Sequence, residues 1–219
     1  MTVERQNLIL ETVVEEYIKN VFPISSDYLK QECDLDVCSS TIRLDLAELT
    51  GKGYLEKPHT SSGRVPTDKG YRFFVDSLKR KQKKSYFNNF FKEVENQIHL
   101  FQLLTENLAH LSAGLSIIQN EDIFWKEGWE EIVKIPEFQD MGYFKDFLEL
   151  VKEFEKKIDL IDVEKEVKVF IGKEIPFKEK NFSMIVSKSK NCVFAILGPK
   201  RMDFKKNIAL MDSLLDAFK

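Results

Sequence analysis

Residues 38–67 read CSSTIRLDLAELTGKGYLEKPHTSSGRVPT. The first half has apolar residues at helical spacing, Ile42, Leu46 and Leu49, and then Gly51 and Gly53, which can end a helix. The second half, residues 54–66, has short strand-like ends around a turn-rich centre with a proline on each side. The stretch therefore predicts a helix that is followed directly by a short hairpin.

Two more helices are predicted before this stretch and one after it. Residues 4–20 have a helical apolar face, which consists of Leu8, Val13, Val14, Tyr17 and Ile18. Ser25, Ser26 and Asp27 can cap a short helix over residues 27–31. Thr67 and Asp68 can cap a helix with the apolar residues Tyr71, Phe74, Val75 and Leu78. The order helix, helix, helix, hairpin is typical of a winged helix-turn-helix.

In such a fold the second helix braces the third, and the third presents its N-terminal residues to the major groove of DNA. Here these residues are Ser39, Ser40 and Thr41, whose small side chains let the backbone approach DNA closely. Arg43 follows, and an arginine can read guanine through two hydrogen bonds or hold a phosphate. The serines could equally be plain helix caps, and Arg43 a solvated surface residue. The hairpin at the right distance favours DNA binding.

The rest of the chain alternates between helical and strand patterns. Residues 87–111 have apolar positions at near-heptad spacing and predict one long helix. Residues 121–157 are expected to be helical, with breaks near Pro136 and Gly142, and a final helix begins at Arg201 or Asp203. Strands are predicted at residues 114–119, 167–172, 182–187 and 192–197. The expected fold class is α+β, with a winged helix-turn-helix followed by a helix-rich domain with a small sheet.

The charge distribution indicates where the chain divides. The net charge of the 219 residues is −3, but residues 39–84 contain 11 basic and 5 acidic side chains. Local positive charge is what matters for binding phosphate groups. The basic run at residues 79–84, KRKQKK, is either a solvated linker or a phosphate-binding segment. We therefore predict two domains: residues 1–84, the DNA-binding module with its basic linker, and residues 85–219.

Several other classes of protein are disfavoured. No segment approaches the roughly 18 apolar residues of a membrane helix, and the charged N-terminus does not match a secretory signal. Cys33, Cys38 and Cys192 are sparse and odd in number, as expected of reduced thiols in a cytoplasmic protein. Cys33, Cys38 and His59 lack the fourth ligand of a zinc site. Without a phosphate loop or a nucleophile elbow, we expect no metal, no cofactor and no enzymatic activity.

Five runs of residues resemble the HrcA family of heat-inducible transcription repressors. Three lie in the N-terminal part: residues 39–43 (SSTIR), 58–67 (PHTSSGRVPT) and 70–76 (GYRFFVD). Two lie later: residues 136–140 (PEFQD) and 197–204 (LGPKRMDF). The second and third runs are long and unusual, so the resemblance is specific.

The resemblance implies a repressor of chaperone genes that binds an inverted-repeat operator as a dimer and releases it on heating. A chaperonin is implied as the partner that keeps the repressor active. The family also has a GAF-like effector domain with an inserted dimerisation segment. This chain is much shorter than typical members, so we expect a reduced GAF-like domain. Cys38 stands where the family usually has Ser, and Leu44 where it usually has Asn.

We predict that this protein binds double-stranded DNA through its third helix and the hairpin. The predicted contact residues are Ser39, Ser40, Thr41, Arg43, His59, Thr60, Ser61, Ser62 and Arg64. Two copies would pair through the apolar stripe of residues 87–111, which we expect to be shared between an interface and a core formed with residues 121–157. Two alternatives stay open: a winged-helix repressor controlled by a small-molecule effector, and a winged helix used for protein–protein interaction.

Overall fold

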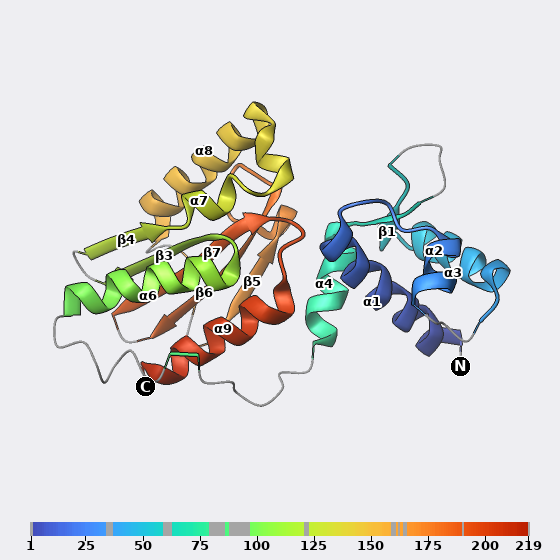
Figure 1. Cartoon of the computed structure of the whole chain (residues 1–219), viewed down its shortest axis with the longest axis horizontal. Helices are drawn as coiled ribbons and strands as arrows, with labels where there is room; N and C mark the ends of the chain where they lie inside the picture. Colours follow the sequence, from blue (N-terminus) through green and yellow to red (C-terminus); the bar gives the residue numbers. More distant parts are fainter. Residues whose placement is uncertain are drawn as a thin grey trace. The chain divides into compact units, whose positions relative to one another are not determined.

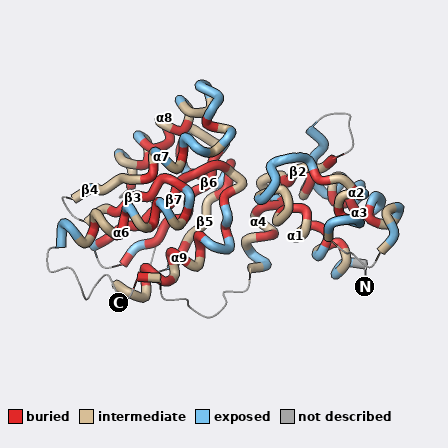
Figure 2. The backbone as a smooth tube through the Cα atoms, viewed as in Figure 1, coloured by how far each residue is buried: buried red, intermediate tan, exposed pale blue. Residues whose placement is uncertain are grey.

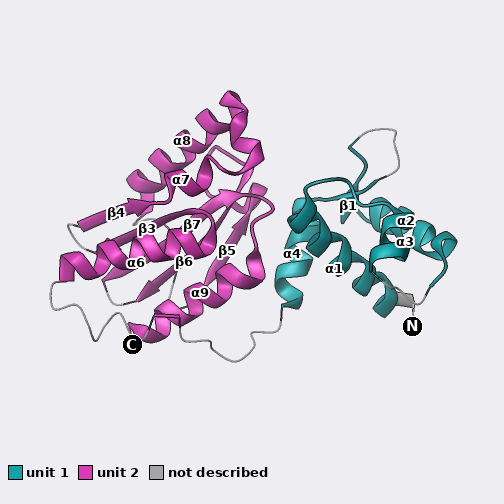
Figure 3. Cartoon of the chain, in the orientation of Figure 1, with its two compact units in different colours: residues 1–79 teal, residues 80–219 magenta. Residues whose placement is uncertain are grey.

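The computed structural model describes residues 2–33, 37–58, 63–78, 86–87, 97–120, 123–158, 161, 163, 166–189 and 191–218. These residues form helices and antiparallel sheets in two compact units, residues 1–79 and 80–219 (Figure 3). The α+β class expected from the sequence is confirmed. Within the described ranges, no helix is both long enough and apolar enough to cross a membrane.

Unit 1, in its described part, contains helices and one two-stranded hairpin. Its elements are α1 (Thr2–Asn20), α2 (Ser26–Glu32), α3 (Ser39–Gly51), β1 (Leu55–Glu56), β2 (Val65–Pro66) and α4 (Asp68–Ser77). The predicted order of three helices, a hairpin and a further helix is confirmed. Two expected caps are also present, because the Ser25 and Thr67 hydroxyls accept hydrogen bonds from the backbone N–H groups of Tyr28 and Gly70.

The buried face of α1 differs from the predicted one. Ile9, Leu10, Val13 and Val14 are buried, whereas Leu8 is exposed. Since α1 contacts α3, α4 and β2, two adjacent residues in successive turns face the core. The placement of Leu8 on the core face was wrong, because spacing alone does not show which of two neighbouring apolar residues meets the packing partners.

The hairpin is tied to the segment that precedes α2. The backbones of Ile24 and Arg64 form an antiparallel bridge, with N···O distances of 2.9 and 2.8 Å. A Cβ atom on Gly63 would lie 2.4 Å from the Cβ of Pro23, which is closer than real atoms approach. Only glycine therefore fits at the base of the hairpin, where the returning strand crosses this segment.

Helix α4 begins in close contact with the residue before β1. A Cβ atom on Gly70 would lie 2.3 Å from the carbonyl oxygen of Tyr54. Tyr71 and Phe74 are buried, and the Lys69 ammonium lies 4.2 Å from the centre of the Tyr54 ring. The GYRFFVD run thus holds the fourth helix against the base of the hairpin.

Unit 2 contains a five-stranded antiparallel sheet with the order β4-β3-β7-β6-β5. The strands are β3 (Leu115–Asn120), β4 (Ile123–Glu127), β5 (Lys168–Ile171), β6 (Phe182–Ser189) and β7 (Cys192–Pro199). The four predicted strands are confirmed. The prediction of a helix from residue 121 is wrong for β4, which pairs with β3 through Asn120 opposite Ile123 and Ser116 opposite Glu127. A short apolar run fits either structure, and here the available strand edge decides between them.

Helices cover both faces of this sheet (Figure 1). On one face lie α7 (Trp129–Ile132), the 3₁₀ turn η1 (Pro136–Gln139) and α8 (Met141–Lys157), and on the other α6 (Gln97–Ser112) and α9 (Phe204–Ala217); a further 3₁₀ turn, η3 (Gly172–Glu174), follows β5. The predicted break near Pro136 is confirmed, whereas Gly142 lies in the first turn of α8. The predicted final helix is confirmed, with Asp203 as its N-cap.

The stripe of the long helix is covered by different elements from those expected. Phe101, Leu104 and Leu108 are buried against the sheet and α9, not against the helices of residues 121–157. Ile98 is 52% exposed, while Phe91 and Val94 lie outside the described residues. The stripe is therefore largely intramolecular core from Phe101 onward.

The other face of the sheet is packed by aromatic rings. Phe138 from η1 lies 4.8 Å from Phe147 of α8, and Phe147 lies 5.2 Å from Phe182 of β6, measured between ring centres. The central strands β3, β6 and β7 are buried along most of their length (Figure 2). Large buried rings of this kind contribute strongly to the stability of unit 2.

Candidate nucleic-acid interface

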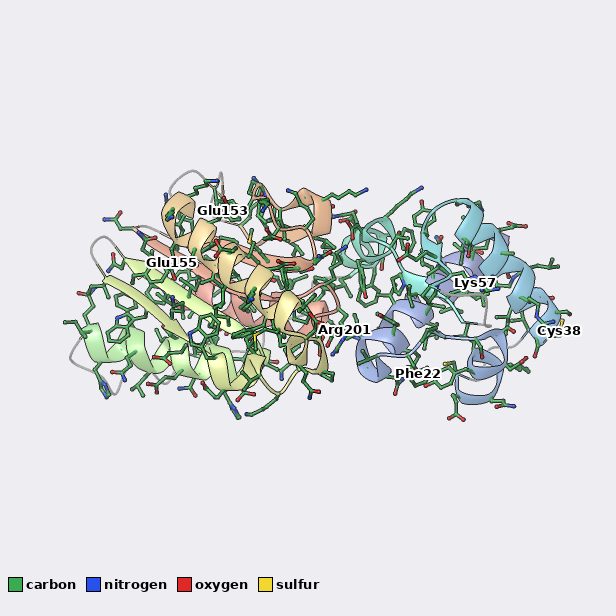
Figure 4. All side chains as sticks on the ribbon, turned by 90° about the horizontal axis from the view of Figure 1, so that it is seen from above. Phe22, Cys38, Lys57, Glu153, Glu155 and Arg201 are labelled. Carbon is green, nitrogen blue, oxygen red and sulfur yellow. The ribbon has the colours of Figure 1, made fainter. Side chains whose placement is uncertain are left out.

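Helix α3 begins with three polar side chains that lie together. Cys38 is the N-cap residue, and its Sγ lies 3.0 Å from the Ser40 hydroxyl and 3.1 Å from the Thr41 hydroxyl. These hydrogen bonds, with the Ser40 hydroxyl first, lower the pKa of the Cys38 thiol to about 6. The side chain of Cys38 lies at the surface of unit 1 (Figure 4). The start of α3 is thus a polar, accessible helix end.

The helix has a sharply divided inner and outer surface. Ile42, Leu46 and Leu49 are buried, as predicted. The residues that face outward are Ser40, Arg43, Leu44, Ala47 and Glu48. Arg43 is exposed, and its guanidinium lies 4.0 Å from an Asp27 carboxylate oxygen of α2. A pair this long and this exposed is weak, so the guanidinium can exchange Asp27 for a phosphate or a base.

The two acidic residues of α3 are hydrogen-bonded to α1, and the Glu48 side chain is nevertheless 59% exposed. Asp45 is buried and accepts two hydrogen bonds from Arg5 of α1, at 2.7 and 3.1 Å, and one from Gln6 at 3.2 Å. The bonds from Arg5 hold the pKa of the Asp45 carboxyl below its usual value. The Glu48 carboxylate accepts a hydrogen bond from Gln6 and lies 3.9 Å from Lys52. These contacts also fix α3 against α1.

Sequence reasoning missed this network. Its one signal is that Asp45 falls among the apolar positions of the helix, where a charged residue needs a buried partner. The partner comes from α1, 40 residues earlier in the chain, and no local pattern indicates Arg5 rather than another basic residue.

Arg64 lies at the base of the hairpin and has contacts within unit 1. Its Nε donates to the Thr50 hydroxyl of α3 at 2.9 Å, and its Nη1 donates to the Gly63 carbonyl at 3.3 Å. Both acceptors are neutral, so these bonds do not neutralise the positive charge. Arg64 therefore joins the hairpin to the end of α3 and still carries a charge that could attract a phosphate.

The predicted contact residues fall into three groups. Ser39, Ser40, Thr41 and Arg43 lie together in the first turns of α3, and Arg64 lies at the hairpin base. The remaining four, His59, Thr60, Ser61 and Ser62, lie outside the described residues. Among the residues that are described, no cluster of three or more His, Cys, Asp or Glu side chains could hold a metal ion.

Unit 2 contains a comparable arginine–carboxylate pair that the sequence analysis also missed. Arg201, in the turn after β7, donates two hydrogen bonds to Glu137 of η1, the Nη2 bond measuring 2.8 Å. The side chain of Arg201 is labelled in Figure 4. The two later runs, PEFQD and LGPKRMDF, are thereby joined in space although they lie far apart in the sequence.

Fold and site together define a two-unit α+β protein in which one unit presents an exposed, acid-free helix end beside a short hairpin. The sequence profile described as the HrcA protein C terminal domain matches residues 69–208, so the chain belongs to the HrcA family. The expected resemblance is confirmed.

Relatives in the same family carry the name heat-inducible transcription repressor HrcA. One from Bifidobacterium longum is 55% identical over 78 residues, which span 36% of this chain and 21% of that protein. One from Dehalococcoides mccartyi is 38% identical over 109 residues, 48% of this chain and 32% of that protein. The chain thus matches only about a fifth to a third of the length of these two relatives. One from Thermodesulfovibrio yellowstonii is 25% identical over 330 aligned positions, 96% of this chain and 95% of that protein.

The fold has also been seen in a solved structure. A crystal structure of a hypothetical protein superposes with a TM-score of 0.83 and covers 98% of this chain and 96% of its own chain. The two sequences are 19% identical, so the likeness concerns the fold alone.

Proposed function

We propose that this protein is a DNA-binding transcription repressor of heat-shock genes, and that unit 1 is a winged helix-turn-helix. The observation that carries the proposal is the N-terminal part of α3, where Ser40 and Arg43 are exposed, the first turn contains no acidic residue and Asp45 is buried against Arg5 of α1. The names of the relatives support repression and its heat dependence.

In the proposed complex α3 lies in the major groove with its N-terminal turn toward the bases. Ser39, Ser40 and Thr41 permit close approach, and Arg43 reads a guanine or holds a phosphate. His59, Thr60, Ser61, Ser62 and Arg64 of the wing contact the neighbouring groove or backbone. The N–H groups in the first turn of α3 add attraction for phosphate.

The proposed assembly is a homodimer on an inverted-repeat operator, because one winged helix makes too few base contacts for genome-scale specificity. Two recognition helices about 34–36 Å apart would read the two half-sites. We assign residues 1–84 to DNA binding and residues 85–219 to a reduced GAF-like domain for regulation and dimerisation. A chaperonin is the proposed partner, and release on heating the proposed signal.

A binding assay with inverted-repeat DNA tests the proposal. We expect Arg43→Ala to weaken binding and to relax sequence preference by about 1–3 kcal/mol, the value of one bidentate base contact. Lys152→Ala is a matched control, since it removes one exposed positive charge from α8 of unit 2. A mutant with the wild-type ratio of operator to random DNA affinity would exclude base reading by Arg43.

The same assay separates the alternatives. A protein-interaction module would show no salt-dependent DNA affinity. A repressor controlled by a small molecule would stay bound to its operator through the heat-shock temperature range and dissociate only when the effector is added. The proposed repressor binds at low temperature and releases on heating alone.

The dimer is tested by sedimentation of the wild-type protein and of Ile98→Glu. Because Ile98 is 52% exposed, we expect the variant to stay folded, to become monomeric and to lose operator affinity while non-specific DNA binding survives. Val133→Glu, at another exposed apolar position of unit 2, is the control and should remain dimeric. A wild-type monomer at micromolar concentration that still binds an inverted repeat tightly would exclude the dimer.

A further inference from the structure

The outer face of α3 contains an exposed leucine between polar neighbours. Leu44 is 67% exposed, directly follows Arg43, and lies one helical turn after Ser40. Ala47, one turn beyond Arg43 on the same side, is also exposed. Single exposed leucines are common on protein surfaces, so the exposure of Leu44 alone carries no conclusion.

The surroundings of Leu44 make it different. Both acidic side chains of α3 are bonded elsewhere, Asp45 to Arg5 and Glu48 to Gln6. Of the outward positions, 40, 43, 44 and 47 offer a hydroxyl, a guanidinium and two apolar groups, and the exposed carboxylate of Glu48, one turn after Leu44, is bonded to Gln6 of α1. The first two turns of this face therefore combine the positive charge of Arg43 with the apolar contact of Leu44, and no acidic residue of α3 is exposed in them.

The major groove contains an apolar group that matches such a contact. Base edges there present hydrogen-bond donors and acceptors, and thymine adds its C5-methyl group. A leucine cannot hydrogen-bond any base, but its methyl groups can pack against that of thymine and exclude water from both. We infer that Leu44 is a specificity-determining residue that reads a thymine methyl beside the position contacted by Arg43. The inference rests on the proposed DNA-binding function.

The probe is a set of DNA duplexes that the full-length protein itself selects from a random library. Each thymine of a selected duplex is then replaced in turn by deoxyuridine, which has the same hydrogen-bonding groups but lacks the methyl. We expect the wild-type affinity to fall about fourfold when the methyl is removed at one position in one half-site, the effect of one buried methyl, and about sixteenfold when both half-sites are changed.

Two variants assign the effect to Leu44. Leu44→Ala should bind the thymine and deoxyuridine duplexes with equal affinity at that position. Leu8→Ala removes another exposed leucine, from α1, and should keep the wild-type discrimination. Both side chains are exposed, so we expect both variants to keep the wild-type circular dichroism spectrum.

The outcomes distinguish this inference from the function on which it rests. If the protein selects DNA but binds thymine and deoxyuridine duplexes equally at every position, the methyl contact is overturned and the DNA-binding function stands. If Leu44→Ala keeps the discrimination, another residue reads the methyl and the assignment is overturned. If the selection yields no duplex, the proposed function fails and the inference fails with it.

Discussion

Each unit contains an arginine that donates two hydrogen bonds to one carboxylate. The pairs differ in which partner, the acid or the arginine, is the more buried. In unit 1 the acid is the buried partner: the Asp45 side chain is 3% exposed and that of Arg5 33%. In unit 2 the arginine is more buried, at 15% for Arg201 and 27% for Glu137. The difference matters because a charge left behind in a buried place costs more than one left in water. In each pair, the substitution that removes the less buried partner should therefore destabilise the unit more than the substitution that removes the more buried one.

The largest effect is expected from Arg5→Ala, which leaves the Asp45 carboxylate buried with only Gln6 as a donor among its observed partners. We expect the thermal midpoint of unit 1 to fall by about 10 °C. Asp45→Asn, which removes the buried charge itself, should cost less. Hydrogen exchange followed by mass spectrometry resolves unit 1 from unit 2. Equal losses for the two variants would show that burial does not set the order.

The corresponding effect in unit 2 should be smaller and should have the opposite order. We expect Glu137→Ala to cost about 2 kcal/mol, since it leaves the more buried guanidinium without this carboxylate, and Arg201→Ala to cost less. Both tryptophans, Trp125 and Trp129, lie in unit 2, so their fluorescence follows its unfolding. An Arg201→Ala variant less stable than Glu137→Ala would contradict the comparison.

Acid should weaken the pair of unit 1. The pKa of Asp45 is lowered in the folded protein by its hydrogen bonds from Arg5. The resulting stabilisation is complete above the unfolded pKa of about 4 and is lost as pH falls through the lower folded value. We expect unit 1 of the wild type to lose stability below about pH 4 more steeply than Asp45→Asn. Parallel pH profiles from thermal unfolding of the two proteins would contradict this.

The smallest structural effect should come from the third arginine contact, in which Arg64 donates to a hydroxyl. Thr50→Val removes this acceptor and should cost about 1 kcal/mol. Arg64→Ala should in addition lower DNA affinity about equally for all sequences and reduce the slope of log affinity against log salt by about 1. Thr50→Val serves as the control and should keep the wild-type slope. An unchanged affinity of Arg64→Ala at low salt would remove Arg64 from the interface.

The local parts of this fold could be predicted from the sequence. The caps at Ser25, Thr67 and Asp203, the apolar face of α3 and the four strands each depend on residues close together in the chain. The wrong assignments depend on distant partners. Residues 123–127 became a strand because the edge of β3 was available, and the stripe of α6 was covered by α9 rather than by the nearer helices.

The candidate site divides in the same way. Ser39, Ser40, Thr41 and Arg43 could be placed at the start of a helix from capping and periodicity, and the structure finds them there. That Arg64 bonds to Thr50, and that Asp45 and Glu48 bond to Arg5 and Gln6 of α1, depends on contacts between elements. The spacing of residues along the chain does not indicate these contacts.

The strand order has a consequence for synthesis of the chain. β7 pairs on one side with β6, which precedes it directly, and on the other with β3, where Asn120 lies opposite Cys192. A growing chain therefore carries the β3–β4 hairpin for a long time with one edge of β3 unpaired, until the residues of β7 have left the ribosome. Unpaired strand edges are sites of mispairing and aggregation. Nascent chains that stop before Cys192 should accordingly aggregate far more readily than the finished protein.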